Sequence, residues 1–285
     1  MTSVDSSSTP EGRGTTPRGS PRERTEIIVT LGILLALLMG ALDQFVVLTA
    51  LPTILHDFGT PNSGSFVVSA YVIASAASIP IFSKLSDLWS RRNVFLAGLA
   101  VFIGGSILSG LSQNLGTLVA FRAIQGFGTG GFLPVGLAIV AMIFPPKTRA
   151  RVTGLLSGVF AIAVVVGPVL GSTIIQYTTW RWVFYVNIPI GLLGFAILLA
   201  TLGPLRPEIT RKFDSVGAAL LLGWVASLMY PLYQIGESSW TWTGVNSLGL
   251  ISLGIAMLVG FVVWELRARN PLVPIRLFAN RVIWA

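Results

Sequence analysis

The sequence contains no cysteine and a single histidine, His56. Without cysteine there is no disulfide framework, no cysteine-ligated zinc or iron–sulfur site and no thiol nucleophile. One histidine leaves almost nothing for histidine-based metal ligation or for a Ser–His triad. We therefore expect no metal, no cofactor and no catalytic residue, and we do not expect an enzyme.

Charged residues are also scarce. Only 11% of the 285 residues are charged, whereas 53% are hydrophobic. Soluble domains typically carry about 25% charged residues. Because a chain with so little charge could not cover its own surface in water, the composition excludes a soluble globular enzyme and indicates a membrane protein.

The chain contains eight long runs without a charged residue. A membrane-spanning helix needs about 20 largely apolar residues. Seven of the runs exceed this length. The first run is shorter, but the apolar sequence continues past Asp43 as far as Leu55 and completes a span. The runs are Ile27–Leu42, Phe58–Ser83, Asn93–Phe121, Ala123–Pro146, Val152–Trp180, Trp182–Leu205, Ser215–Gly236 and Ser238–Trp264. We predict an all-α polytopic membrane protein with eight spanning helices.

The basic residues are distributed asymmetrically between the loops. All but two of the 19 Lys and Arg residues fall in the N-terminal tail, in the loops after spans 2, 4 and 6, and after span 8. The exceptions are Arg181, on the opposite side, and Arg122, within a span. Since short cytoplasmic loops are rich in Lys and Arg, we predict a cytoplasmic N-terminus. The net charge of +8 is then explained by the membrane topology. The expected partner is therefore the lipid bilayer rather than nucleic acid.

Composition divides the chain into four parts. Residues 1–25, rich in Ser, Thr, Pro, Gly and Arg, are expected to form a disordered cytoplasmic tail. Residues 26–203 hold six spans, which we expect to form one helical bundle. Residues 204–279 begin with a polar, proline-containing cytoplasmic loop and continue through spans 7 and 8 and the loop that follows. Residues 280–285 are interpreted as the start of a truncated ninth span.

Asp43 lies deep in the first span. A carboxylate at this depth costs several kcal/mol unless it pairs, is protonated or faces water. Asp43 is therefore a candidate proton carrier or cation partner. The alternatives are an acid hydrated near the outer interface and an acid tied to a structural arginine.

Arg122 interrupts the fourth span, and Gln125 follows one helical turn later. The arginine must find a carboxylate or carbonyl groups, whether its role is functional or only to hold two helices together. At four-residue spacing, one stripe of the helix is predicted to contain Arg122, Gly126, Gly130 and Pro134. The glycines of this stripe let another backbone approach closely.

The fifth span carries Gly158, Gly167, Pro168 and Gly171. Pro168 removes a backbone hydrogen bond, and the glycines permit bending and close packing. The alternative is ordinary small-residue packing in a bundle.

Two short segments outside the spans also stand out. In the loop after span 2, Asp87 precedes Arg91 and Arg92 and could form a charged latch. Taken alone, however, the pattern favours topology-determining basic residues with one acid. The run Trp180–Arg181–Trp182 is typical of an aromatic belt at the outer membrane interface.

Several of these motifs, in this order, resemble those of the major facilitator superfamily. Asp87, Arg91 and Arg92 match its loop motif Gly-x-x-x-Asp-x-x-Gly-Arg-[Arg/Lys], with serines in place of both glycines. The stretch Arg122–Gly126, which contains Gln125, resembles its span-4 motif Arg-x-x-Gln-Gly. The glycine and proline residues of span 5 resemble its antiporter motif, with Ser172 where many members have a further glycine.

Three further segments resemble the drug:proton antiporter family with fourteen spanning helices. They are Leu42–Pro52, Trp180–Gly191 and Phe213–Gly217. This resemblance implies two six-helix bundles with two extra helices between them, so that a C-terminal half is missing here.

The resemblance implies proton-coupled export of a lipophilic or cationic small molecule by the intact protein, in the cell membrane or, alternatively, the vacuolar membrane. Asp43 would exchange protons, and Arg122 with Gln125 would couple that exchange to conformation. Gly167–Pro168 would bend span 5, and Asp87 would latch against the other half. No Gly-x-x-x-x-Gly-Lys-[Ser/Thr] pattern for ATP occurs in the sequence, so a proton gradient is the expected driving force.

Two other functions are also compatible with the sequence. One is uptake or organellar transport of basic amino acids or metal chelates. The other is a truncated, non-transporting product, or a half-transporter that pairs with a second chain. The aromatic residues Phe45, Tyr71 and Phe127 are candidates for lining a lipophilic pocket.

Overall fold

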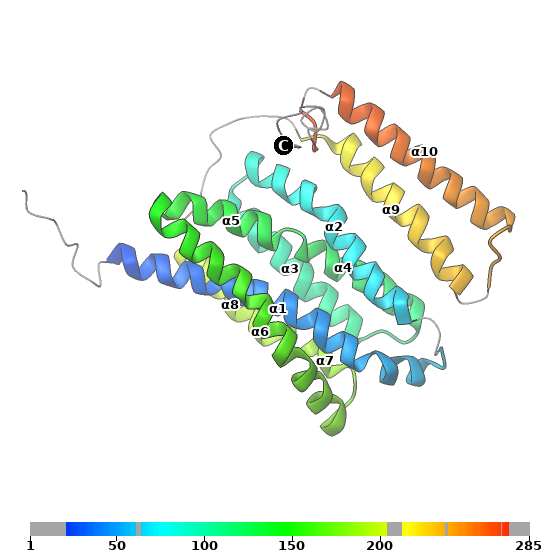
Figure 1. Cartoon of the computed structure of the whole chain (residues 1–285), viewed down its shortest axis with the longest axis horizontal. Helices are drawn as coiled ribbons and strands as arrows, with labels where there is room; N and C mark the ends of the chain where they lie inside the picture. The colour runs from blue at the N-terminus through cyan, green and yellow to red at the C-terminus, as the bar shows by residue number, and fades with distance from the viewer. Residues whose placement is uncertain (1–20, 61–63, 204–212, 237–238, 269, 274–285) are drawn as a thin grey trace, which may run out of the picture.

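The computed structural model describes residues 21–60, 64–203, 213–236, 239–268 and 270–273. Throughout these ranges the regular secondary structure is helical, which confirms the predicted all-α class (Figure 1). The helices are α1 (Pro21–Phe58), α2 (Gly64–Leu88), α3 (Arg91–Gly110), α4 (Leu115–Thr129), α5 (Phe132–Ile143), α6 (Pro146–Tyr177), α7 (Trp182–Tyr185), α8 (Asn187–Thr201), α9 (Ser215–Gly236) and α10 (Val245–Arg267).

Eight helical stretches in these ranges are long and apolar enough to cross a membrane, as predicted. A helix satisfies its own backbone hydrogen bonds, which is what the apolar interior of a bilayer requires. Two of the stretches consist of consecutive helices, since α4 and α5 together form one span and α7 and α8 form another. The chain is therefore an integral, multi-pass membrane protein.

The fourth span is interrupted at Gly130 and Gly131, so the stripe predicted from Arg122 to Pro134 crosses a break between α4 and α5. Both glycines keep right-handed helical dihedrals. A Cβ atom on Gly130 would collide with the Ser75 carbonyl of α2, and one on Gly131 would lie 2.7 Å from the Phe82 ring. The break thus lies at a point where the chain is in close contact with α2.

Helix α1 begins earlier than the sequence predicted. It starts at Pro21, so residues 21–25, expected in the disordered tail, are helical. Proline is well suited to the first position of a helix, and Arg and Glu are good helix formers. The rest of the tail, the loop at 204–212 and the ninth span predicted at 280–285 lie outside the described residues.

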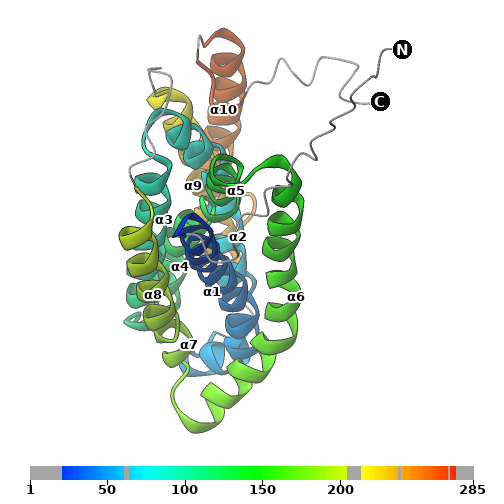
Figure 2. The ribbon, with the colours of Figure 1, turned by 90° about the vertical axis from the view of Figure 1, so that its left-hand side faces the viewer.

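Helix α1 lies in the middle of the bundle and packs along α6 on one side and α8 on the other (Figure 2). Helix α4 packs between α2 and α3, while α9 and α10 pair with each other and join the bundle through α2. The large apolar core of the bundle includes the rings of Phe95, Phe102 and Phe132.

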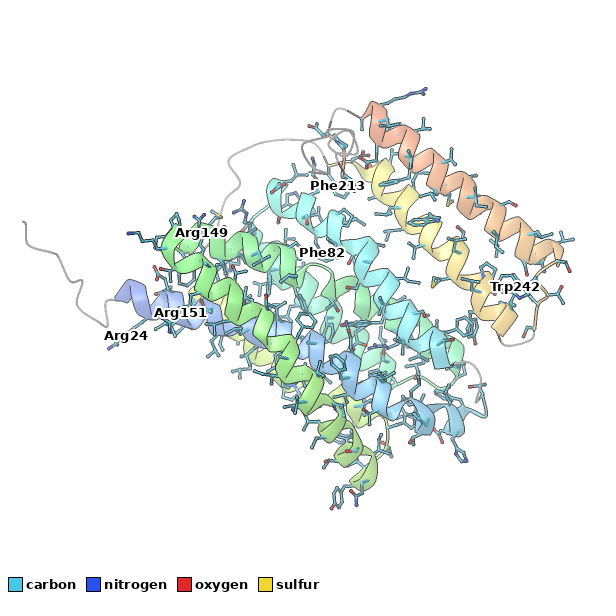
Figure 3. The ribbon with its side chains drawn as sticks, in the orientation of Figure 1. Arg24, Phe82, Arg149, Arg151, Phe213 and Trp242 are labelled. Carbon is cyan, nitrogen blue, oxygen red and sulfur yellow. The ribbon has the colours of Figure 1, made fainter. Side chains whose placement is uncertain are left out.

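Basic side chains gather at one end of the molecule. Arg24, Arg149 and Arg151 lie at this end, which we call the basic end, whereas Trp242 lies at the opposite end (Figure 3). The segregation of charge predicted from the sequence is therefore present in the folded chain, in line with the loop asymmetry that sets membrane topology.

Candidate functional site: a buried charge network

Asp43 and Arg122 form an ion pair in the interior of the bundle. Arg122 Nη1 donates a hydrogen bond of 2.5 Å to Asp43 Oδ2. Both side chains are at most 1% exposed. Of the alternatives for Asp43, the structure excludes a hydrated acid near the interface and shows one paired with an arginine.

Amide side chains complete the shell around the carboxylate. Gln125 Nε2 donates to Asp43 Oδ1 at 2.9 Å, and Asn187 Nδ2 donates to the same oxygen at 2.8 Å. Both amides also donate to Ser106 Oγ, which donates in turn to the Phe184 carbonyl. Asp43 thus accepts from three side chains on two other helices, an arrangement that suits the ionised carboxylate.

The guanidinium group of Arg122 is enclosed by aromatic rings and an amide. Its Cζ atom lies 4.1 Å from the centre of the Tyr71 ring and 5.8 Å from that of Phe184. Its Nη1 also donates to Gln125 Oε1 at 2.8 Å. Cation–π contacts of this kind stabilise a desolvated cation by about 2 kcal/mol.

The Arg122 Nε atom is buried and has no hydrogen-bond partner among the described residues. Most buried polar atoms in proteins have such a partner, so the hydrogen bonding of the guanidinium is incomplete on this side.

Local sequence explains how these groups meet. Arg122 and Gln125 are three residues apart on α4, so they lie on the same face of the helix. The start of α4 is fixed by a capping box between Asn114 and Thr117. On α3, a Cβ atom at Gly105 would come within 2.6 Å of the Gln125 backbone, so only glycine allows this approach.

The pair carries a large energetic penalty if it is broken. Removing one partner of a buried ion pair typically costs about 3–5 kcal/mol, because the other charge is left uncompensated. The ion pair therefore holds α1 against α4, and the hydrogen bond from Asn187 adds α8 to the same contact.

The predicted latch residues Asp87, Arg91 and Arg92 differ in the contacts that their side chains make. Arg91 donates to the Ala138 carbonyl on α5 at 3.1 Å, and Arg92 donates to the Leu199 carbonyl on α8 at 2.8 Å. Asp87 is exposed, and within the described ranges its side chain forms no hydrogen bond or ion pair. The two arginines thus tie α3 to neighbouring helices, and a latch through Asp87 stays a prediction.

The glycines of the antiporter-like motif lie on two sides of α6. A Cβ atom at Gly167 would lie 2.5 Å from Phe45 Cβ, and one at Gly171 would lie 3.0 Å from Thr49 Cβ, both on α1. Gly158 has no neighbour that a Cβ atom would meet within 4 Å. Helix α6 continues through Pro168 and curves along its length (Figure 2).

Sequence reasoning did not single out Asn187 and Ser106 as members of the site. Both are fully buried polar residues in spans. In the sequence, Asn187 is an amide within an apolar run, and this pattern is a signal that identifies it as a candidate. Ser106 lies among small residues, where a serine is ordinary in a membrane helix.

Trp180 also differs from its predicted role at the membrane interface. It is 4% exposed, packs edge-on against Phe58 at 5.4 Å and donates from Nε1 to Asp57 Oδ2 at 2.8 Å. Trp182, by contrast, is 54% exposed and suits an aromatic belt. The hydrogen bond to α1 explains why the first of the two tryptophans turns inward.

A cavity of about 360 Å³ lies beside the network on the α1, α2, α5 and α6 side. Gln44, Thr129 and Phe160 are among its lining residues. Phe127 lines a second cavity, but Tyr71 is buried against Arg122 and Phe45 packs at Gly167. Of the three aromatic residues proposed to line a pocket, Phe127 does so.

The fold and the network define a class: a helical membrane protein of the transporter type, with charged residues buried where spans meet. Residues 33–279 match the sequence profile of the Major Facilitator Superfamily. The chain therefore belongs to this superfamily.

Curated relatives agree with this assignment. Multidrug resistance protein 3 of Bacillus subtilis (strain 168) is 35% identical over 254 residues, which are 89% of this chain and 49% of the relative. Efflux pump dotC of Dothistroma septosporum (strain NZE10 / CBS 128990) is 36% identical over 261 residues, 89% of this chain and 45% of the relative. The chain thus spans about half the length of the curated relatives it matches.

Solved structures show the same fold. A crystal structure of a POT family transporter in complex with 5-aminolevulinic acid aligns with a TM-score of 0.60 at 16% identity, covering 85% of this chain and 53% of that one. The human organic anion transporter MFSD10 (TETRAN) aligns with a TM-score of 0.53 at 19% identity, covering 83% and 70%.

Proposed function

We propose that this chain is part of a transporter that exports small lipophilic or cationic molecules across a membrane in exchange for protons. The family and the names of its relatives, a multidrug resistance protein and an efflux pump, support export of small molecules. The observation that carries the proton-coupled part is the Asp43–Arg122 ion pair.

The proposed coupling follows from charge compensation. With Asp43 ionised, the pair is neutral as a whole and holds α1 against α4. When Asp43 takes up a proton, Arg122 loses its counter-ion and the conformation that buries both groups becomes less stable. A second conformation in which Arg122 is hydrated or otherwise paired would then gain population.

The other residues have supporting roles in this proposal. Gln125 and Asn187 hold the carboxylate in place, and Tyr71 confines the guanidinium. Gly167 and Gly171 let α6 slide against α1, and Asp87 with Arg91 and Arg92 stabilises one conformation at the basic end. A second bundle would complete the pathway, and we place the protein in the cell membrane. The described residues contain no cluster of side chains that could hold a metal ion.

The test is transport by the protein, produced from its native gene and reconstituted in liposomes. An imposed proton gradient should drive movement of a lipophilic cationic dye against its concentration gradient, and dissipating the gradient with a protonophore should abolish that movement. Dye movement at a rate that is independent of the proton gradient would contradict proton coupling. Proton-driven movement of basic amino acids, and not of the dye, would favour the alternative of uptake or organellar transport.

A further inference from the structure

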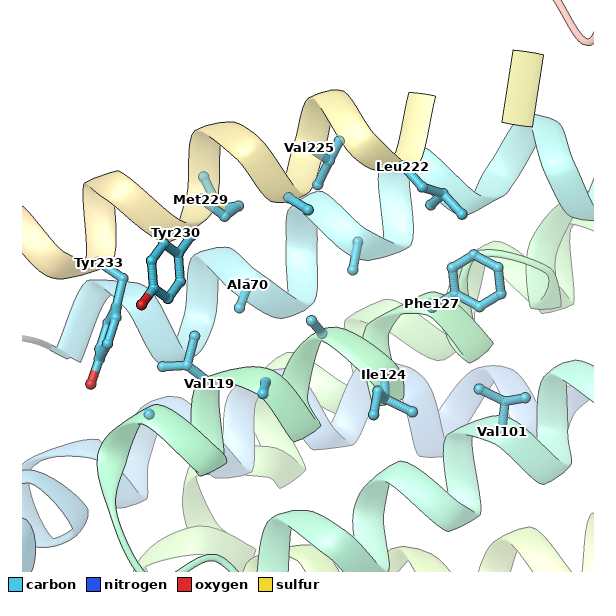
Figure 4. Close-up of a pocket in the computed structure, with 15 residues that line it drawn as sticks. Ala70, Val101, Val119, Ile124, Phe127, Leu222, Val225, Met229, Tyr230 and Tyr233 are labelled. Atoms are coloured by element: carbon cyan, nitrogen blue, oxygen red, sulfur yellow. The ribbon is translucent and has the colours of Figure 1, made fainter. Parts of the chain in front are cut away.

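A second cavity, of about 590 Å³, separates α9 from the bundle helices α2, α3 and α4 (Figure 4). Its volume lies within the range of small-molecule sites in proteins. It does not contain Asp43 or Arg122, and the proposed transport mechanism does not use it. Its wall on α4 is made of residues that recur at helical spacing, among them Gly116, Ala120, Ala123 and Phe127.

The lining is almost entirely apolar. No charged side chain contributes to it, and the hydroxyl groups in the lining belong to Tyr230 and Tyr233. Both tyrosines lie at the same end of the cavity, whereas Leu222 and Phe127 lie at the other (Figure 4). The ligand that suits this lining is a hydrocarbon with any polar group confined to the tyrosine end.

The cavity is long and narrow, so we call it the α4–α9 slot. On α4 it extends from Gly116 to Phe127, and on α9 from Leu222 to Tyr233. At 1.5 Å per residue, each wall is about 16 Å long. Half of the hydrocarbon core of a bilayer is about 15 Å thick, so the slot matches the depth of one leaflet.

The slot is open along one side. On α4, the lining residues Ala120 and Ile124 are exposed, and on α9 so are Leu222, Ala226 and Tyr230. In each helix these residues are four apart, so they form two facing rows along the length of the slot. Both helices are membrane spans, and the exposed lining residues carry no charge, as expected of a surface that meets hydrocarbon. An extended chain can enter such an opening sideways.

The tyrosine end lies at the level where head groups are expected. The Tyr230 ring packs edge-on against Trp240 at 5.6 Å, and Trp242 nearby in sequence is 62% exposed. Tyrosine and tryptophan collect at the interface between hydrocarbon and head groups. Leu222 and Phe127 consequently lie near the middle of the membrane.

We propose that the α4–α9 slot binds one acyl chain of a lipid from the leaflet at the end opposite the basic end. The chain lies between the two rows of exposed residues, its terminal methyl group reaches Phe127, and its head group lies beside Tyr230. The bound chain fills the space between α9 and α4, so the α9–α10 pair is joined to the bundle partly through lipid. This inference does not depend on the direction or the driving force of transport.

The experiment is photo-crosslinking in liposomes made with a phosphatidylcholine that carries a diazirine near the end of one acyl chain. After irradiation, labelled residues are mapped by mass spectrometry. We expect adducts concentrated on α4 around Ala123–Phe127 and on α9 around Leu222–Val225. Adducts spread evenly over the exposed faces of α6, α9 and α10 would overturn the proposal without any variant.

Two variants and one matched control sharpen the test. Ala120→Phe and Ala226→Phe place a ring in the slot and leave less room for an acyl chain, so labelling at the slot should fall on the order of tenfold, which corresponds to about 1.4 kcal/mol. Ala256→Phe adds the same ring at an exposed position of α10 and should leave slot labelling unchanged.

Thermal unfolding of each variant verifies that it is folded. Slot labelling that persists in folded Ala226→Phe would overturn the proposal. So would displacement of the photo-lipid by the lipophilic dye at concentrations that saturate transport, because the slot would then belong to transported molecules.

Discussion

Asn187 on α8 donates a hydrogen bond of 2.8 Å to Asp43 on α1, although 144 residues separate them in the chain. Replacing Asn187 with Leu removes one donor from Asp43 and from Ser106 while keeping a similar branched shape, and Gln125 still donates to both acceptors. Loss of a hydrogen bond to a charged group costs about 1.5–3 kcal/mol. We expect a lower unfolding temperature, measured by intrinsic tryptophan fluorescence of the purified protein.

The control for this change is Asn93→Leu, at an exposed position of α3. It should leave the unfolding temperature nearly unchanged. Equal effects of the two variants would argue against a structural role for the Asn187 amide.

The ion pair itself is tested by a double-mutant cycle. Asp43→Asn and Arg122→Gln should each destabilise the protein by about 3–5 kcal/mol, and the double variant by clearly less than their sum. Reversible unfolding in denaturant measures all four proteins. The reference is the partly exposed pair of Arg181 and Asp57, whose atoms are 3.8 Å apart. Such a pair should give a coupling energy of about 0–1 kcal/mol, and an equally small value for Asp43 and Arg122 would contradict the buried network.

Adjacent glycines on α3 offer a test of helix packing. Gly105→Ala places a Cβ atom 2.6 Å from the Gln125 backbone, whereas a Cβ atom at Gly104 meets nothing within 4 Å. Overpacking of this kind costs about 1–3 kcal/mol, so the unfolding temperature of Gly105→Ala should fall. Gly104→Ala should be neutral or stabilising, because alanine is the better helix former by about 1 kcal/mol. Similar losses in both would mean that α3 and α4 are not in close contact at Gln125.

Two neighbouring tryptophans distinguish a buried role from an interfacial one. Trp180→Phe removes the hydrogen bond to Asp57 and part of a packed ring, so we expect a loss of about 1–3 kcal/mol in stability. Trp182→Phe alters an exposed ring and should change stability by less than about 0.5 kcal/mol. The prediction fails if Trp182→Phe is the more destabilising of the two in the same unfolding assay.

Much of the architecture could be predicted from sequence because the membrane imposes it. Long uncharged runs separated by charge define the spans, and the scarcity of charge made Asp43 and Arg122 stand out. Their pairing was one of several open alternatives, because periodicity does not specify which helices meet. The break at Gly130 and Gly131 depends on contact with α2, which no local pattern reveals.

Sequence reasoning missed Asn187 and Ser106 for the same physical reason. Asn187 and Ser106 acquire their importance from partners on other helices, not from neighbours in the chain. Trp180 was assigned to the interface because exposed and inward-facing tryptophans share the same local sequence. For Ser106 and Trp180 the signal comes only from the three-dimensional packing, whereas the Asn187 amide is also visible in the sequence as a polar residue within an apolar run.

We propose that protonation of Asp43 drives the transport cycle, and the most direct measurement compares wild type with Asp43→Asn in proteoliposomes. Both proteins, verified as folded, are assayed for proton-gradient-driven movement of a cationic dye and for exchange of labelled against unlabelled dye without a gradient. We predict that Asp43→Asn loses gradient-driven movement and retains exchange, since exchange does not require a proton cycle. Gradient-driven movement at the wild-type rate in Asp43→Asn would contradict it.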